Sequence, residues 1–102
     1  MKEIDESIKE KDFMQQIIDA ARYKGWLVYH TYDSRRSATG FPDLVMLKDK
    51  RLIFAEIKRE KGKVAEFQYQ WLKALKGTNR CEVNVWKPSD WNSIMSTLKD
   101  SQ

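Results

Sequence analysis

The residues of this 102-residue chain best suited to chemistry lie in one short stretch, Gly40 to Glu60. Its segments DLVML and LIFAEIK read as two strands joined by the turn KDKR. Yet Asp43, Glu56 and Lys58 stand where a core strand would carry apolar side chains. These three charges are either the solvated ends of a sheet or the centre of a reactive site.

The spacing of the two acids bears on that choice. If positions 49 and 50 are the central turn residues, Lys48 pairs with Arg51, and counting back along the ladder places Asp43 opposite Glu56. Directly opposed residues share one face of a sheet, with Cβ atoms about 4.5–5.5 Å apart. Two carboxylates this close repel each other unless a cation lies between them. The register therefore predicts a cation site, with the solvated sheet end as the alternative.

The donor types indicate which cation and which reaction. Oxygen ligands favour hard ions such as Mg²⁺ or Mn²⁺ over zinc, and the chain has only one cysteine and one histidine. Lys58 follows Glu56 by two residues and so points to the same face. A metal ion polarises a phosphate and activates water, while an ammonium group orients that water or stabilises charge on the phosphoryl oxygens. The arrangement suits phosphodiester hydrolysis.

Two residues in expected helices would extend the site. Glu10 lies on the apolar stripe of Met14 and Ile17, which would direct it towards the sheet as a third carboxylate. Alternatively, it is a favourable acid in the first turn of a helix. Gln68 shares the apolar stripe of Leu72, and a buried amide needs a hydrogen-bond partner.

The elements that would position these residues follow the order α-β-β-β-α-β-α. Apolar residues at helical spacing predict helices at 7–24 and 65–76, each followed by a glycine. Aromatic, β-branched or alternating runs predict strands at 26–32, 43–47, 52–58 and 80–87. The sequence Pro-Ser-Asp then signals the start of a short last helix. We expect a single α/β domain over residues 1–102, with a mixed central sheet flanked by helices.

The charge and the composition indicate which kinds of partner the protein can bind. The net charge of +4 favours an anionic partner, although acidic and basic residues are mixed along the chain. Two expected loops near the strand ends carry a basic rim, either solvated or in contact with phosphates. The residues of this basic rim are Arg35, Arg36, Arg59, Lys61 and Lys63.

The same composition bears on location. No window is long and apolar enough to span a membrane, and the charged N-terminus lacks a cleavable leader. The lone Cys81 cannot form an internal disulfide, and His30, in an expected strand, fits a structural role better than a catalytic one. We expect a soluble protein of a reducing cytoplasm.

Several motifs together resemble a known family. GFPDL, a hairpin, EIK, a glycine-containing loop, a helix with Gln before Trp-Leu, and VWKPSDW resemble the VRR-NUC family, a branch of the PD-(D/E)xK nuclease superfamily. The resemblance covers about residues 10–91 and looks closest to small stand-alone members found in phages and bacteria. It implies a PD-(D/E)xK restriction-endonuclease-like core, whose element order agrees with the one expected from periodicity.

The resemblance also implies roles for individual residues. Asp43, Glu56 and the backbone carbonyl of Ile57 would bind one or two Mg²⁺ or Mn²⁺ ions. Lys58 would be the catalytic lysine, and Gln68 the glutamine that positions it or a phosphate oxygen.

Two features of this chain fit the family pattern less closely. Glu10 would be the acid of the first helix and a further metal ligand, with the acids at positions 3, 6 and 12 as neighbours that could take its place. Ala65 and Glu66 stand where the family often has Ser-Pro, so the second helix lacks a capping hydroxyl, at a cost of about 1 kcal/mol.

The function implied by the resemblance is that of a metal-dependent, structure-specific DNA endonuclease. Its substrate would be branched DNA such as Holliday junctions or flaps, in the cytoplasm of a bacterial or phage-infected cell. A homodimer would place two active sites across a junction. The alternative from another class is a non-catalytic nucleic-acid-binding subunit that keeps the fold and acts through a partner.

Overall fold

The computed structural model describes residues 8–31 and 38–100. Within these ranges the predicted order of elements is confirmed, with a short 3₁₀ turn before the last helix. The elements are α1 (Glu10–Tyr23), β1 (Leu27–His30), β2 (Leu44–Lys48), β3 (Arg51–Ile57), α2 (Glu66–Gly77), β4 (Glu82–Trp86), η1 (Pro88–Asp90) and α3 (Trp91–Thr97). None of these helices has the length and apolar character that crossing a membrane requires.

The four strands form one mixed sheet in the order β1-β2-β3-β4. β1, β2 and β3 are antiparallel neighbours, whereas β4 runs parallel to β3. In the hairpin, Lys48 pairs with Arg51 and Leu44 pairs with Ala55. The predicted register is therefore confirmed along the whole of β2.

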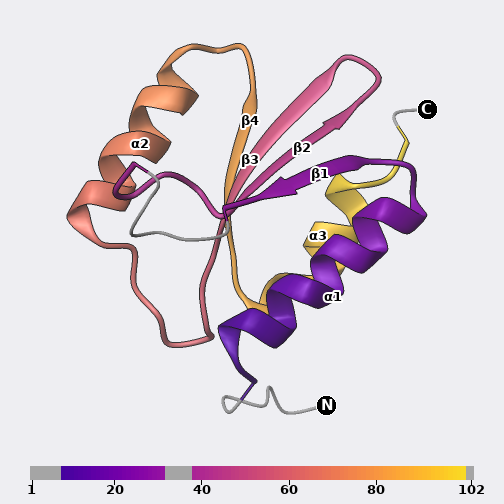
Figure 1. The fold of residues 1–102 in the computed structure, drawn as a ribbon, viewed down its shortest axis with the longest axis horizontal. Helices are drawn as coiled ribbons and strands as arrows, with labels where there is room; N and C mark the ends of the chain where they lie inside the picture. Colours follow the sequence, from indigo (N-terminus) through magenta and orange to yellow (C-terminus); the bar gives the residue numbers. More distant parts are fainter. Residues whose placement is uncertain (1–7, 32–37, 101–102) are drawn as a thin grey trace.

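The helices cover the two faces of the sheet unequally. Figure 1 shows α1 and α3 on one side of the sheet and α2 on the other. The main core lies between the sheet and α1 with α3, and it buries alternate residues of β2 and β3 because strand side chains alternate between faces. Its fully buried members include Ile17, Leu44, Met46, Ile53, Ala55, Ile57, Ile94 and Leu98.

Several element ends differ from the sequence prediction by one to a few residues. Asp43 and Lys58 lie one residue outside β2 and β3, which begin at Leu44 and end at Ile57 respectively. β4 begins only at Glu82, since Asn79 takes a positive φ of 56° in the preceding turn. The expected basic loop at 33–40 falls mostly outside the described residues, together with Arg35 and Arg36.

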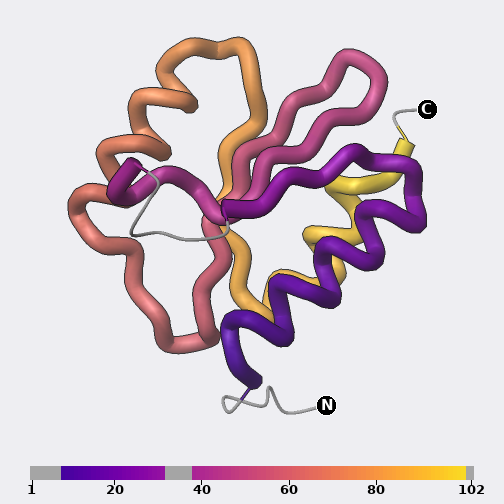
Figure 2. The backbone as a smooth tube through the Cα atoms, viewed as in Figure 1, coloured from indigo at the N-terminus to yellow at the C-terminus, as the bar shows by residue number. Residues whose placement is uncertain are grey.

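A second set of contacts fixes the segment 38–43 against α2. Figure 2 shows this segment running beside the helix. The indole Nε1 of Trp71 donates a hydrogen bond to the carbonyl oxygen of Thr39 at 3.0 Å. The ring of Phe41 packs edge-on against Trp71, with centroids 5.2 Å apart, and against Phe54 at 6.0 Å. These contacts tie the GFPD segment to α2 and so bring Asp43 close to the start of that helix.

Candidate active site

The candidate site begins with two carboxylates at one end of the sheet. Carried one residue past β2, the confirmed register places Asp43 opposite Glu56. The backbone N–H of Ile57 donates to Asp43 Oδ2 at 2.8 Å, and that of Thr31 donates to the Asp43 carbonyl at 3.0 Å. Backbone groups of two neighbouring strand ends therefore hold Asp43 in place.

Glu56 is the buried partner of this pair. It is only 2% exposed, and no other charged residue within 8–31 and 38–100 is buried. Its Oε2 accepts a hydrogen bond from Gln68 Nε2 at 2.8 Å and lies 3.4 Å from Lys58 Nζ. Its Oε1 is buried without a hydrogen-bond donor among the described residues. A buried carboxylate oxygen in this situation calls for a proton or a cation.

The electrostatics of the pair agree with that requirement. Burial, together with the nearby Asp43 carboxylate, raises the pKa of Glu56 to about 7, while Lys58 opposes the shift. Burial also raises the pKa of Asp43, against the lowering effect of the Ile57 N–H bond, of Glu56 and of Lys58. Without a cation, the pair therefore retains a proton near neutral pH. A hard divalent ion fits the Glu56 oxygen that has no donor and the all-oxygen donor set.

Gln68 links α2 to this pair. Its Oε1 accepts the backbone N–H of Ala65 at 2.9 Å, while its Nε2 donates to Glu56. Ala65 provides no side-chain cap, as its residue type predicts, and the Gln68 oxygen satisfies one of the free N–H groups at the helix start instead. The amide thus contacts Glu56 directly and Lys58 only through the Glu56 oxygen that both groups share.

Lys58 emerges just after β3 and its side chain is 13% exposed. Its backbone N–H donates to the Trp86 carbonyl at 3.0 Å, which extends the pairing with β4 by one bond. The ammonium group is therefore carried by a fixed backbone beside Glu56. It lies at the end of the sheet, where a bound substrate could reach it.

Glu10, in the first turn of α1, lies within electrostatic reach of the pair. Partial burial and the Asp43 charge raise the pKa of Glu10, whereas Lys58 and Arg59 lower it. In the part of the chain that the structure describes, however, no three Asp, Glu, His or Cys side chains form a group that could hold a metal ion. The assignment of Glu10 as a third ligand stays a prediction, as does that of the Ile57 carbonyl.

The described part of the basic rim lies on the loop that follows Lys58. Arg59, Lys61 and Lys63 are all exposed there. Glu60 Oε1 accepts the backbone N–H of Ser89 at 2.9 Å, which joins this loop to η1. The role of these three cations in contacting phosphates stays a prediction.

One contact that supports the site has no signal in the helical spacing. Phe67 is 48% exposed, and within α2 only Leu72 is buried. The contact of Trp71 with Thr39, which anchors the GFPD segment, was not predicted. The one sequence feature that could have indicated this contact is Trp71 itself, on the face of α2 towards the GFPD segment.

The raised pKa of Glu56 predicts a pH-dependent stability in the metal-free protein. A carboxyl whose pKa is higher in the folded than in the unfolded state stabilises the fold below its ordinary pKa of 4.5, and this contribution disappears as pH rises through about 7. We expect this group to lower the free energy of unfolding by roughly 2 kcal/mol between pH 5 and pH 8.

Urea denaturation in a chelator at several pH values measures this dependence. Glu56→Gln keeps an acceptor for Gln68 and removes the titration, so this variant should be more stable than the parent at pH 8 and should lack the Glu56 part of the pH slope. Parallel pH profiles for parent and variant would contradict the assigned pKa.

The chain was compared with protein-family models and with curated proteins. A family model described as the VRR-NUC domain matches residues 2–89, a range that contains every candidate residue discussed above. No curated protein matches the chain.

Proposed function

Because the chain belongs to the VRR-NUC domain family, a family of nuclease-type domains, we propose that it is a metal-dependent, structure-specific DNA endonuclease that hydrolyses phosphodiester bonds. The observation that carries the proposal is the buried Glu56 beside Asp43, with one carboxylate oxygen lacking a donor among the described residues. A structural acid would be expected to have both oxygens satisfied or to lie at the surface.

The cofactor in this proposal is Mg²⁺ or Mn²⁺. Asp43 and Glu56 would hold it, with the Ile57 carbonyl and Glu10 as further ligands. When bound, the ion would polarise a phosphate and neutralise charge that develops during hydrolysis.

The protein's own groups supply positioning and charge. The Ile57 N–H fixes Asp43, and Gln68 fixes Glu56, so both carboxylates keep one orientation. Lys58 lies 3.4 Å from Glu56 Oε2 with its side chain 13% exposed, and it would orient the attacking water or stabilise a phosphoryl oxygen. Glu56 remains ionised more readily with Lys58 present, since the ammonium group lowers the carboxyl pKa.

The substrate in this proposal is branched DNA, such as a Holliday junction or a flap, in the cytoplasm of a bacterial or phage-infected cell. Arg59, Lys61 and Lys63 would contact the phosphates that flank the cleaved bond, together with Arg35 and Arg36. A homodimer would present two such sites to the two sides of a branch point.

A cleavage panel tests the proposed function. Plain duplex, nicked duplex, flap and four-way junction of matched sequence are incubated with the protein in Mg²⁺, in Mn²⁺ and in a chelator, at fixed salt, because binding to phosphates falls steeply with ionic strength. We expect cleavage of a branched form at least about tenfold faster than of plain duplex, a difference of about 1.4 kcal/mol in barrier, and none in the chelator. Binding to all forms without cleavage in either metal would instead support the non-catalytic subunit.

A further inference from the structure

A cavity of about 350 Å³ adjoins the candidate active site. It lies between the segment 38–43 and the first turn of α2. Its lining includes Asp43 and Gln68 together with Thr31, Thr39 and Phe67. Since Asp43 and Gln68 also belong to the candidate active site, a group held in the cavity would lie directly beside the reacting phosphate.

Phe67 forms an exposed aromatic wall of this cavity. The ring is 48% exposed although it sits in the first turn of α2, next to buried parts of the site. One ring edge faces Gly40, where an added Cβ would lie 3.0 Å from Phe67 Cδ2. Gly40 therefore packs closely against this edge of the ring, and the exposed part of Phe67, which lines the cavity, can contact a flat apolar ligand.

Two polar groups around the cavity already have partners within the protein. Thr31 Oγ1 donates to the Pro42 carbonyl at 3.1 Å, and the Thr39 carbonyl accepts from Trp71. Stacking on Phe67 would therefore contribute more to the binding free energy of a ligand than hydrogen bonds to the polar edge of that ligand. The volume lies near the lower end of the range for small-molecule sites, which suits a single ring system.

Building on the nuclease function proposed above, we propose that this cavity holds one unpaired nucleobase next to the scissile phosphate, stacked on Phe67. Every base has an aromatic face, so this binding tolerates any sequence. The substrate class that follows is DNA with an unpaired nucleotide at the branch, such as a flap or a splayed end. A fully paired duplex or a junction with fully paired arms cannot fill the cavity without unpairing a base.

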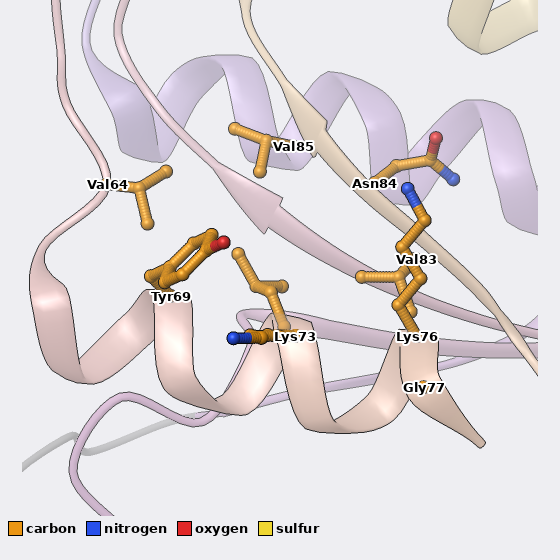
Figure 3. A pocket seen from close by; sticks show the side chains of 9 residues that line it. Val64, Tyr69, Lys73, Lys76, Gly77, Val83, Asn84 and Val85 are labelled. Atoms are coloured by element: carbon orange, nitrogen blue, oxygen red, sulfur yellow. The ribbon is translucent and has the colours of Figure 1, made fainter.

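The same helix offers a matched control residue. Tyr69 is 52% exposed, close to the value for Phe67, but it lines a different groove of about 450 Å³ between α2 and β4. Figure 3 shows its ring lying near Val64 and Val85 in that groove. Removing the Tyr69 ring deletes a comparable exposed aromatic surface from α2 without changing the cavity beside Asp43.

The test compares two flap substrates of one sequence in single-turnover cleavage with Mn²⁺. The flap is first mapped for its cut site, and an abasic residue then replaces the unpaired nucleotide beside that site. We expect the parent to cleave the intact flap about tenfold faster than the abasic one, because stacking of a base on an aromatic side chain has an effect of this order. Phe67→Ala should reduce this ratio to near one by slowing only the intact flap, and Tyr69→Ala should keep it.

Two further variants and a binding measurement distinguish failure of the base site from failure of the nuclease function. Phe67→Leu keeps an apolar wall and should also lose the ratio, whereas Phe67→Trp should restore it. A 2-aminopurine base at the same position should be quenched on binding to the parent and not to Phe67→Ala. Phe67-dependent quenching without any cleavage would retain the base site and reject the nuclease function. A cleavage ratio or quenching unchanged in Phe67→Ala would overturn the base site, whether or not DNA is cleaved.

Discussion

Replacing Lys58 with alanine is expected to lower the cleavage rate by about 10²–10⁴-fold, the usual range for a group that transfers a proton or stabilises charge in the transition state. The Lys58 ammonium lies 3.4 Å from Glu56 Oε2 at the sheet end, and in the proposed mechanism it acts on a bound phosphate or its attacking water. Its backbone bond to Trp86 does not depend on the side chain, so the fold should persist. Single-turnover cleavage and circular dichroism measure the two effects.

Lys50→Ala is the matched control for that experiment. Lys50 is an exposed lysine in the turn between β2 and β3, at the opposite end of the hairpin from the candidate site. Its removal changes the net charge by the same amount and should leave cleavage within about twofold of the parent, as is usual for surface changes away from special features. Equal cleavage by Lys58→Ala and Lys50→Ala would remove Lys58 from the mechanism.

Replacing Gly40 with alanine is expected to destabilise the protein by roughly 3 kcal/mol, a sum of backbone strain and overpacking. Gly40 has a φ of +88°, which other residues rarely adopt, and an added Cβ would lie 2.5 Å from the Phe67 carbonyl oxygen. That oxygen belongs to the backbone of α2, so relief requires moving the helix that carries Gln68. Cleavage should therefore fall as well, because the Glu56 carboxylate loses its fixed partner.

Gly77→Ala provides the control for this change. Gly77 is the last residue of α2, and an added Cβ there has no neighbour within 4 Å among the described atoms. Alanine is favoured over glycine in a helix by roughly 0.5–1 kcal/mol, so this variant should be as stable as the parent or slightly more so. Urea denaturation of both variants measures the contrast, and a Gly40→Ala protein as stable as Gly77→Ala would refute the close packing at Gly40.

The sheet and the carboxylate pair could be predicted because they depend on local patterns. The turn at positions 49 and 50 determines the hairpin register, and a period of two then places Asp43, Glu56 and Lys58 on one face. The alternation that buries Ile53, Ala55 and Ile57 on the other face is equally visible in the sequence. The presence of the helices could likewise be predicted from the spacing of their apolar residues.

Contacts between distant elements could not be predicted in the same way. The bond between Gln68 and Glu56 depends on where α2 rests on the sheet, and spacing within α2 suggested only that the amide needs a partner. The distance of Glu10 from the carboxylate pair depends likewise on the packing of α1, which periodicity does not specify.

Titration calorimetry with Mn²⁺ tests the central claim most directly, namely that Asp43 and Glu56 together bind a divalent ion. The parent and Asp43→Asn are titrated near pH 8, where the raised pKa of Glu56 no longer favours a bound proton. The asparagine oxygen can still accept the Ile57 N–H, so the variant should keep its fold while losing one of the two charges. We expect a saturable binding heat for the parent that disappears in Asp43→Asn. No heat in the parent, or the same heat in both proteins, would contradict a metal site at this pair.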